Sequence, residues 1–368
     1  MCQLLGMSGC HLKLKDAALH DLLLCETECG ESLAVEAYGL DEDVRGGEVA
    51  GGDGEVVASG QVDDGTGEEG CADDEVVAAG VEGVKAEGGE DIPGRHLTAV
   101  IIPSEAADVV VTLDHAGLWT DTRYFIQAIN QLEGTGFVLH KTRIPEQVLI
   151  PEWLRTNLEK DAIIVVDGLC QSASSISEIS DDFTVVSIPN ILDRLWTDRP
   201  GIPQTPIFAV NSGESRSSKL SWLRNFVKEK GCNAILLSAL DEIAWILNVR
   251  ASDIEYNPFV ISYLLVSEDD VKWFVLKDEV EDEVTQATFD ILRSDGVALL
   301  PYSEIELYLG ENVEGRLFLD SESVNYHLWS VVDTDIVFEP SPVQLRKAIK
   351  NSFELEGMRK AHFNDGLV

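Results

Sequence analysis

From residue 95 onward, short apolar runs typical of β-strands alternate with segments that have a helical pattern. In the first part of this region a helix is predicted over 122–132, where apolar residues recur at Phe125, Ala128, Ile129 and Leu132. Strands are predicted around it, at 97–103, 108–114, 116–121 and 137–141. Because strands that alternate with helices pack most simply as an α/β domain, this pattern predicts the fold class α/β.

A second α/β unit starts at AIIVVDG (162–168), whose four consecutive apolar residues are typical of a strand buried on both faces. Further strands are predicted at 183–189, 207–210, 234–238, 259–266, 270–276, 297–301 and 316–320. Helices are predicted at 172–179, 190–196, 214–230, 240–248, 282–293, 303–309 and 321–332. The two strands joined around 268–270 form a hairpin, so the sheet is expected to be mixed.

Two helices of the second unit carry further detail. Gly231 follows the helix over 214–230, at the position where a glycine ends a helix most easily. In LDEIAWILN (240–248), Ser238 is predicted to cap the helix, with Asp241 three residues later as in a capping box. Trp245 adds an apolar side chain away from the main apolar stripe, so we expect this helix to be widely buried.

The first 94 residues differ in composition from the rest. Residues 41–90 contain sixteen acidic residues and thirteen glycines against two basic residues, and no aromatic residue. Such a segment buries too little apolar surface to offset the entropy of ordering it, so we expect 1–94 to be mostly disordered. A short helix around 13–25 is the exception. The segment is interpreted either as an acidic interaction tail or as an extension without function, and its composition favours the second.

The charge balance excludes two classes of partner. With 27 Lys and Arg against 66 Asp and Glu, the chain has a formal net charge of −39, whereas nucleic acids and anionic membranes require basic patches. We find no run of eighteen apolar residues and no secretory signal, which favours the cytoplasm. The seven cysteines are an odd number, typical of reduced thiols. Cys25 and Cys29 have a spacing that can ligate a metal, but no second pair follows.

Three blocks of the sequence resemble one known family. LWTDTRYFIQA (118–128), LDEIAWILNVRASDIEYNP (240–258) and SPVQLRKAIKNSFELEGMRKAH (341–362) are similar to segments of the aminopeptidase P branch of the creatinase/prolidase family. Members of that branch are Xaa-Pro aminopeptidases, which remove an N-terminal residue that precedes proline. The resemblance covers about Leu97 to Val368. It is specific for the family and not for a substrate.

The resemblance implies a domain organisation. Its three-domain members have two creatinase-N-type α/β domains followed by a "pita-bread" catalytic domain. Applied to this sequence, it implies a truncated first domain at 95–160, a second domain at 161–340, and the start of the catalytic domain at 341–368. The expected partners are a peptide substrate in the full-length family and a second copy in a homodimer.

The family also implies a metal cofactor that we do not expect in these residues. Its catalytic domain holds two divalent ions, usually manganese, on two aspartates, one histidine and two glutamates, and all five would lie beyond Val368. Independently, no histidine of the α/β region stands four residues from another or pairs with a glutamate at helical spacing. We therefore predict no catalytic residue and no metal ligand here, and no activity for the chain alone.

One site residue is carried over by the resemblance. In the family, the arginine of the WTDTRYF block reaches the peptide substrate, which makes Arg123 the candidate substrate-binding residue. A guanidinium suits this role because its planar fork binds carboxylate or carbonyl oxygens with fixed geometry. The alternative is an arginine in the first turn of a helix that pairs with Asp121. Both interpretations stay open on the sequence.

The sequence departs from the family pattern in three places. Thr122 and Ala251 stand where relatives commonly have glycine, so a positive φ at Thr122 would be a genuine outlier. A helix and a loop that the family has are also absent between the runs at 97–103 and 108–114. A parallel pair of strands needs a crossover, so we expect a damaged first domain with exposed apolar surface.

Three hypotheses follow for function. The chain is part of an Xaa-Pro aminopeptidase without its catalytic half, or it is a non-catalytic module for dimerisation or peptide binding. The third hypothesis is a faulty gene model, since the acidic N-terminus, the absent segment and the abrupt end would then share one cause.

Overall fold

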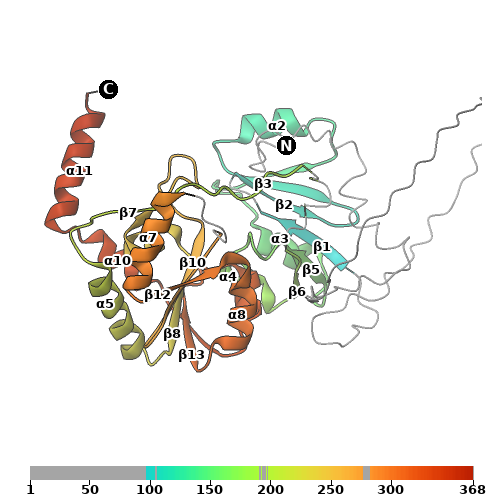
Figure 1. Cartoon of the computed structure of the whole chain (residues 1–368). Coiled ribbons are helices and arrows are strands. Elements are labelled where there is room, and N and C mark those ends of the chain that lie inside the picture. The colour runs from blue at the N-terminus through green and yellow to red at the C-terminus, as the bar shows by residue number, and fades with distance from the viewer. Residues whose placement is uncertain are drawn as a thin grey trace, which may run out of the picture.

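The computed structural model describes residues 97–103, 106–189, 192, 196, 198–276 and 282–367. These residues form two lobes, each built on one six-stranded sheet (Figure 1). The expected disorder of 1–94, the helix around 13–25 and most of the helix predicted at 190–196 lie outside the described residues.

The first sheet has the strand order β4-β3-β2-β1-β5-β6. Its strands are β1 (Leu97–Ile102), β2 (Ala107–Val111), β3 (Ala116–Thr120), β4 (Val138–Lys141), β5 (Ile163–Val166) and β6 (Thr184–Ser187). Its helices are α2 (Phe125–Leu132), α3 (Ile150–Asn157) and α4 (Ala173–Ser180). Only β2 runs antiparallel to its neighbours, so the carboxyl ends of the other five strands lie at one edge of the sheet.

The second sheet has the order β12-β11-β10-β8-β13-β14. Its strands are β8 (Ala234–Leu237), β10 (Ser262–Ser267), β11 (Val271–Val275), β12 (Val297–Pro301), β13 (Arg316–Leu319) and β14 (Asp335–Phe338). A small separate sheet pairs β7 (Phe208–Ala209) with β9 (Val249–Arg250). The helices of this lobe are α5 (Arg216–Glu229), α6 (Leu240–Leu247), α7 (Glu283–Ser294), α8 (Ile305–Asn312) and α9 (Tyr326–Ser330), with a 3-10 turn η2 (Tyr302–Glu304).

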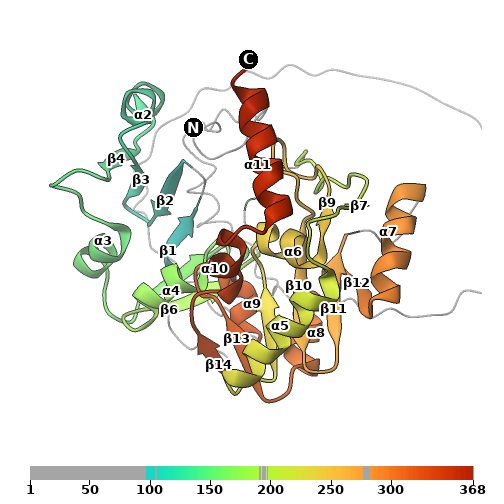
Figure 2. The ribbon, with the colours of Figure 1, turned by 90° about the vertical axis from the view of Figure 1, so that its left-hand side faces the viewer.

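Two further helices follow the second sheet. They are α10 (Pro342–Ala348) and α11 (Ser352–Asp365). Figures 1 and 2 show α11 extending away from the second lobe. A capping box fixes its start, because the Asn351 side chain accepts from the Glu354 N–H and the Glu354 side chain accepts from the Asn351 N–H, each at 2.9 Å.

The two sheets have the same strand order and the same strand directions, which confirms two similar mixed-sheet α/β units. The units meet through equivalent loops, one between β5 and α4 and one between β13 and α9. In each loop an aspartate accepts from the N–H two residues later, and an N-cap side chain starts the helix. The loops exchange four backbone hydrogen bonds of 2.7–3.0 Å in two reciprocal pairs: Ala173 to Val324 with Tyr326 to Gln171, and Ser174 to Ser321 with His327 to Gly168.

The boundary predicted after residue 160 divides the first sheet. β5 and β6 lie beyond that boundary, yet β5 pairs with β1 and β6 pairs with β5. The change from one sheet to the other falls between Ser187 and Phe208. The sequence pattern alone gives the strands but not their partners.

The expected damage to the first domain does not extend to its sheet, which has all six strands paired. Large apolar side chains of this unit are nevertheless exposed, with Leu113, Ile126 and Ile129 at 60%, 79% and 53%. β1 and β2 are antiparallel, with Val100 opposite Val111, so the four residues between them need not form a crossover. Val100, Val109 and Val111 are at most 3% exposed, so the strands carry no bare apolar surface there. The first unit does lack a helix between β1 and β2, where the second unit has α6 between β8 and β10.

Helix α6 confirms the predicted burial but not the predicted cap. Every residue from Glu242 to Leu247 is buried, including Trp245 at 7% exposure. The N-cap is Ala239, one residue later than predicted, and no side chain caps the helix. Ser238 Oγ is buried without a hydrogen-bond partner. At the end of α5, Gly231 has the positive φ of +66° that its predicted capping role requires.

Candidate functional site

The sequence-predicted site residue Arg123 lies between β3 and α2, at the edge where the parallel strands end. Asp121, next to the end of β3, holds it by a forked contact: Nε donates to Oδ1 at 3.0 Å and to Oδ2 at 3.1 Å, and Nη2 donates to Oδ2 at 2.7 Å. The backbone N–H of Arg123 also donates to Asp121 Oδ1 at 3.0 Å. The ring of Tyr124 lies 5.3 Å from the guanidinium carbon.

This pairing orients the guanidinium without burying it. The Arg123 side chain is 63% exposed, whereas that of Asp121 is 10% exposed. Hydrogen bonds from Arg123 hold the pKa of Asp121 down at about 2, so the carboxylate stays ionised. The ion pair with Asp121, which was the alternative interpretation, is thus formed. It leaves the Arg123 side chain exposed enough to contact a ligand.

The two departures from glycine cause no backbone strain. The described non-glycine residues with positive φ are Arg143, Asn248 and Tyr256, and neither Thr122 nor Ala251 is among them. The placement of Arg123 is therefore compatible with a threonine before it. Ala251 is 1% exposed and packs in the core of the second unit.

The described residues do not fit the two-metal centre that the resemblance implies. Among them, no three His, Cys, Asp or Glu side chains converge on one point. His115 and His140 approach to 3.3 Å between their Nε2 atoms, but His140 stacks on Trp119 and His115 on Trp153. His327 contacts Ser187 and Glu306 at the junction of the two units. We therefore derive no metal-dependent step from these residues.

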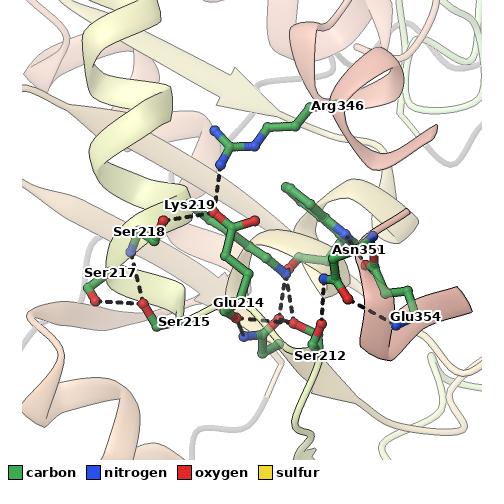
Figure 3. Close-up of polar contacts among 11 residues, drawn as sticks. Ser212, Glu214, Ser215, Ser217, Ser218, Lys219, Arg346, Asn351 and Glu354 are labelled. Carbon is green, nitrogen blue, oxygen red and sulfur yellow. Dashed lines mark hydrogen bonds and ion pairs between the residues drawn. The ribbon is translucent and has the colours of Figure 1, made fainter. Parts of the chain in front are cut away.

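A second polar cluster, which the sequence did not indicate, joins the second unit to α10 and α11 (Figure 3). At its centre the Lys219 side chain is fully buried, and its Nζ donates to Asn248 Oδ1 at 2.7 Å, to the Trp245 carbonyl at 2.8 Å and to Ser212 Oγ at 3.0 Å. The Trp245 ring lies 3.9 Å from Nζ. Burial lowers the pKa of Lys219 to about 8, against the opposing attraction of Glu214 and Glu354.

The outer members of this cluster come from the C-terminal helices. Arg346 Nη2 donates to Glu214 Oε1 at 2.6 Å, and the Asn351 side chain donates to the Ser212 carbonyl at 2.8 Å. Trp245 Nε1 donates to Glu354 Oε1 at 3.0 Å. These contacts fix the direction in which α11 leaves the second unit.

Known proteins that are similar to this chain support this architecture. Residues 198–354 match the family model described as "Creatinase/Prolidase N-terminal domain". The chain is 33% identical over 277 residues to the Xaa-Pro aminopeptidase app-1 of Caenorhabditis elegans, covering 70% of this chain and 44% of that protein. It is 30% identical over 291 residues to Aminopeptidase P1 of Arabidopsis thaliana, with the same two shares.

The chain belongs to the aminopeptidase P branch of the creatinase/prolidase family. Its fold is similar to the crystal structure of X-prolyl aminopeptidase from Caenorhabditis elegans, described as a cytosolic enzyme with a di-nuclear active site. That similarity has a TM-score of 0.65 at 30% identity and covers 74% of this chain and 50% of the other. The chain thus spans less than half the length of the curated aminopeptidase P relatives named above. Within the described residues, no helix is long and apolar enough to cross a bilayer.

Proposed function

We propose that these residues are the N-terminal domains of an Xaa-Pro aminopeptidase, and that they help to hold the peptide substrate while metal-dependent hydrolysis is carried out elsewhere. The similarity to Xaa-Pro aminopeptidases over 70% of the chain supports the reaction class. The observation that carries the proposal is Arg123, whose guanidinium is oriented by Asp121 and is 63% exposed at the carboxyl edge of the first sheet. Ligands of α/β sheets bind at such edges.

The proposal separates peptide binding from metal-dependent hydrolysis because of the side chains that the described residues contain. The described residues hold no cluster suited to a metal ion, while the related C. elegans enzyme has a di-nuclear site. We propose that the family's two divalent ions, manganese by our expectation, belong to a catalytic domain that begins with α10 and α11. The Lys219 cluster then serves to orient that domain, because it joins the second unit to α11. The proposed compartment is the cytoplasm.

A homodimer is the proposed assembly, by the resemblance to the family. Leu345 on α10, Ile349 at the end of α10 and Phe363 on α11 are 78%, 82% and 67% exposed, and we assign this apolar surface to the proposed catalytic domain that begins with these helices, not to the dimer. Measuring the mass of the purified chain in solution tests the homodimer. A monomer at all concentrations would count against it.

Peptide binding tests the proposal for Arg123. An Xaa-Pro peptide such as Ala-Pro-Ala is titrated into the purified chain and into the variant Arg123→Gln, with binding measured by calorimetry. A charge-assisted hydrogen bond contributes about 1.5–3 kcal/mol, so binding should weaken by about tenfold or more. Arg155→Gln is the matched control, because Arg155 is also an exposed arginine of the first unit paired with one aspartate. Equal effects of the two variants, or none, would contradict the proposal.

A further inference from the structure

Arg143 has a backbone conformation that arginine rarely adopts. Its φ is +58°, in the left-handed region that favours glycine. For an L-residue this conformation is disfavoured by roughly fivefold to thirtyfold in an equilibrium constant. One local contact stabilises the turn, because the Arg143 N–H donates to Gln147 Oε1 at 2.7 Å. That contact uses the backbone and is available to any residue except proline.

The side chain of Arg143 contributes little to the stability of the folded state. It forms an ion pair with Asp121, with 3.6 Å between Nη1 and Oδ2, and the Arg143 side chain is 73% exposed. Exposed ion pairs of this kind favour the folded state by about fivefold at most. Asp121 is moreover already held by Arg123 through both carboxylate oxygens. The free-energy cost of the positive φ at Arg143 therefore exceeds the stabilisation that its ion pair with Asp121 provides. Stability of the fold does not account for an arginine at this position.

The topology brings the two arginines to one place. β3 and β4 are parallel neighbours, and the N–H of Thr142, the residue after β4, donates at 2.8 Å to the carbonyl of Thr120, the last residue of β3. Arg123 and Arg143 thus flank Asp121 at the carboxyl edge of the sheet. The three side chains together carry one net positive charge, in a chain whose formal net charge is −39. Backbone strain at such an edge is typical of residues placed for binding.

We propose that Arg143 acts with Arg123 as a two-guanidinium site for a carboxylate of the bound peptide. This inference rests on the proposed function, which places the peptide at Arg123, and it adds a specificity determinant at Arg143. The Nε and Nη2 groups of Arg123 already face Asp121, so the donors proposed for the ligand are its Nη1 side and the Arg143 guanidinium. Two guanidinium groups beside one anion provide several N–H donors in fixed directions, a geometry suited to a carboxylate. The carboxylate is the peptide's own C-terminus or an acidic side chain near it.

The first test uses acetate alone as the probe. The Nε–Hε signals of arginines are followed by NMR while acetate is added at constant ionic strength. Saturable shifts at Arg123 and Arg143, with no comparable shift at Arg155, are the expected result. Arg155 is the matched control, since it is exposed and paired with Asp182 in the same unit. Equal, non-saturating shifts at all three arginines would mean general anion screening and would overturn the site.

The second test compares peptides. Arg143→Gly should weaken binding of Ala-Pro-Ala by about twofold to fivefold, and should leave binding of its C-terminal amide unchanged. A third peptide, Ala-Pro-Asp-amide, has an acidic side chain but no free C-terminus. If Arg143→Gly weakens its binding, the carboxylate that the site binds is an acidic side chain. A purely structural role predicts instead that Arg143→Gly lowers the unfolding midpoint, whereas relief of strain predicts an equal or higher midpoint.

The outcomes separate the two proposals. Peptide binding that depends on Arg123 but ignores both Arg143→Gly and C-terminal amidation would overturn the inference and leave the proposed function standing. Saturable acetate binding at both arginines without any peptide binding would overturn the proposed function.

Discussion

Replacing Trp245 with alanine should destabilise the second unit by about 4 kcal/mol. The side chain is 7% exposed, and a tryptophan buries roughly 150–250 Å². At about 25 cal/mol per Å² this corresponds to ~4–6 kcal/mol, which the β-carbon retained by alanine and relaxation around the cavity reduce to about 3–5 kcal/mol. The change also removes the ring beside Lys219 and the hydrogen bond to Glu354.

Urea unfolding followed by far-ultraviolet circular dichroism measures this loss. The transition of the second unit should move to lower urea with an unchanged slope, since the folded unit itself stays compact. Trp222→Ala is the control, because Trp222 lies on α5, is half-buried and stacks on Arg346 at 4.2 Å. It should cost about half as much. A loss below about 1 kcal/mol for Trp245→Ala would refute the argument that α6 is a core helix.

Three further predictions concern stability and its dependence on pH. Burial lowers the pKa of both His115 and His140 below the ordinary 6.5, so the unfolded chain binds more protons below that pH. The stability of the first unit should therefore fall as the pH drops from 7 to 5, measured as a lower urea midpoint. The double variant His115→Gln/His140→Gln should show a smaller fall. Burial likewise lowers the pKa of Lys219 from 10.5 to about 8, so the unfolded chain binds more protons between these two values. The urea midpoint of the second unit should therefore rise between pH 8 and 10. A midpoint that does not change with pH in Lys219→Met would assign the rise to Lys219. Gly315→Ala should lower the thermal midpoint more than Gly296→Ala, because both glycines have φ near +80° but only at Gly315 would an added Cβ meet a side chain, that of Asn233 at 2.2 Å.

The strands and helices were predictable because apolar periodicity reports burial directly. The runs at 97–103 and 162–168 became β1 and β5, and the wide apolar cover of 240–248 became the buried helix α6. Periodicity was less reliable where a helix packs by a narrow face. On α2, Ala128 and Leu132 are buried as predicted, but Ile129 is 53% exposed.

The errors have physical causes. Ser238 lies one residue before the N-cap position, so its hydroxyl is out of register with the first free N–H groups of α6. A connection of four residues between β1 and β2 in fact indicates an antiparallel pair, and weighing that length would have corrected the topology. The boundary after residue 160 was misplaced because strand pairing is a long-range property.

Of the two polar sites, the sequence indicated only Arg123. Lys219 has the pattern of an ordinary lysine on a serine-rich helix, and its burial arises from α6 and from the C-terminal helices, which are distant in sequence. The left-handed conformation of Arg143 has no local signal either, since no glycine or asparagine marks the turn. Both features depend on contacts between segments that no local pattern connects.

Hydrolysis by the chain itself tests the central claim most directly, namely that these domains hold a peptide but do not carry the metal-dependent chemistry. The purified 368-residue chain is incubated with manganese and Ala-Pro-Ala, with and without a chelator, and release of the N-terminal alanine is followed by mass spectrometry. The account predicts no release above the rate of the peptide alone. Release that requires proline at the second position and stops on adding the chelator would contradict it.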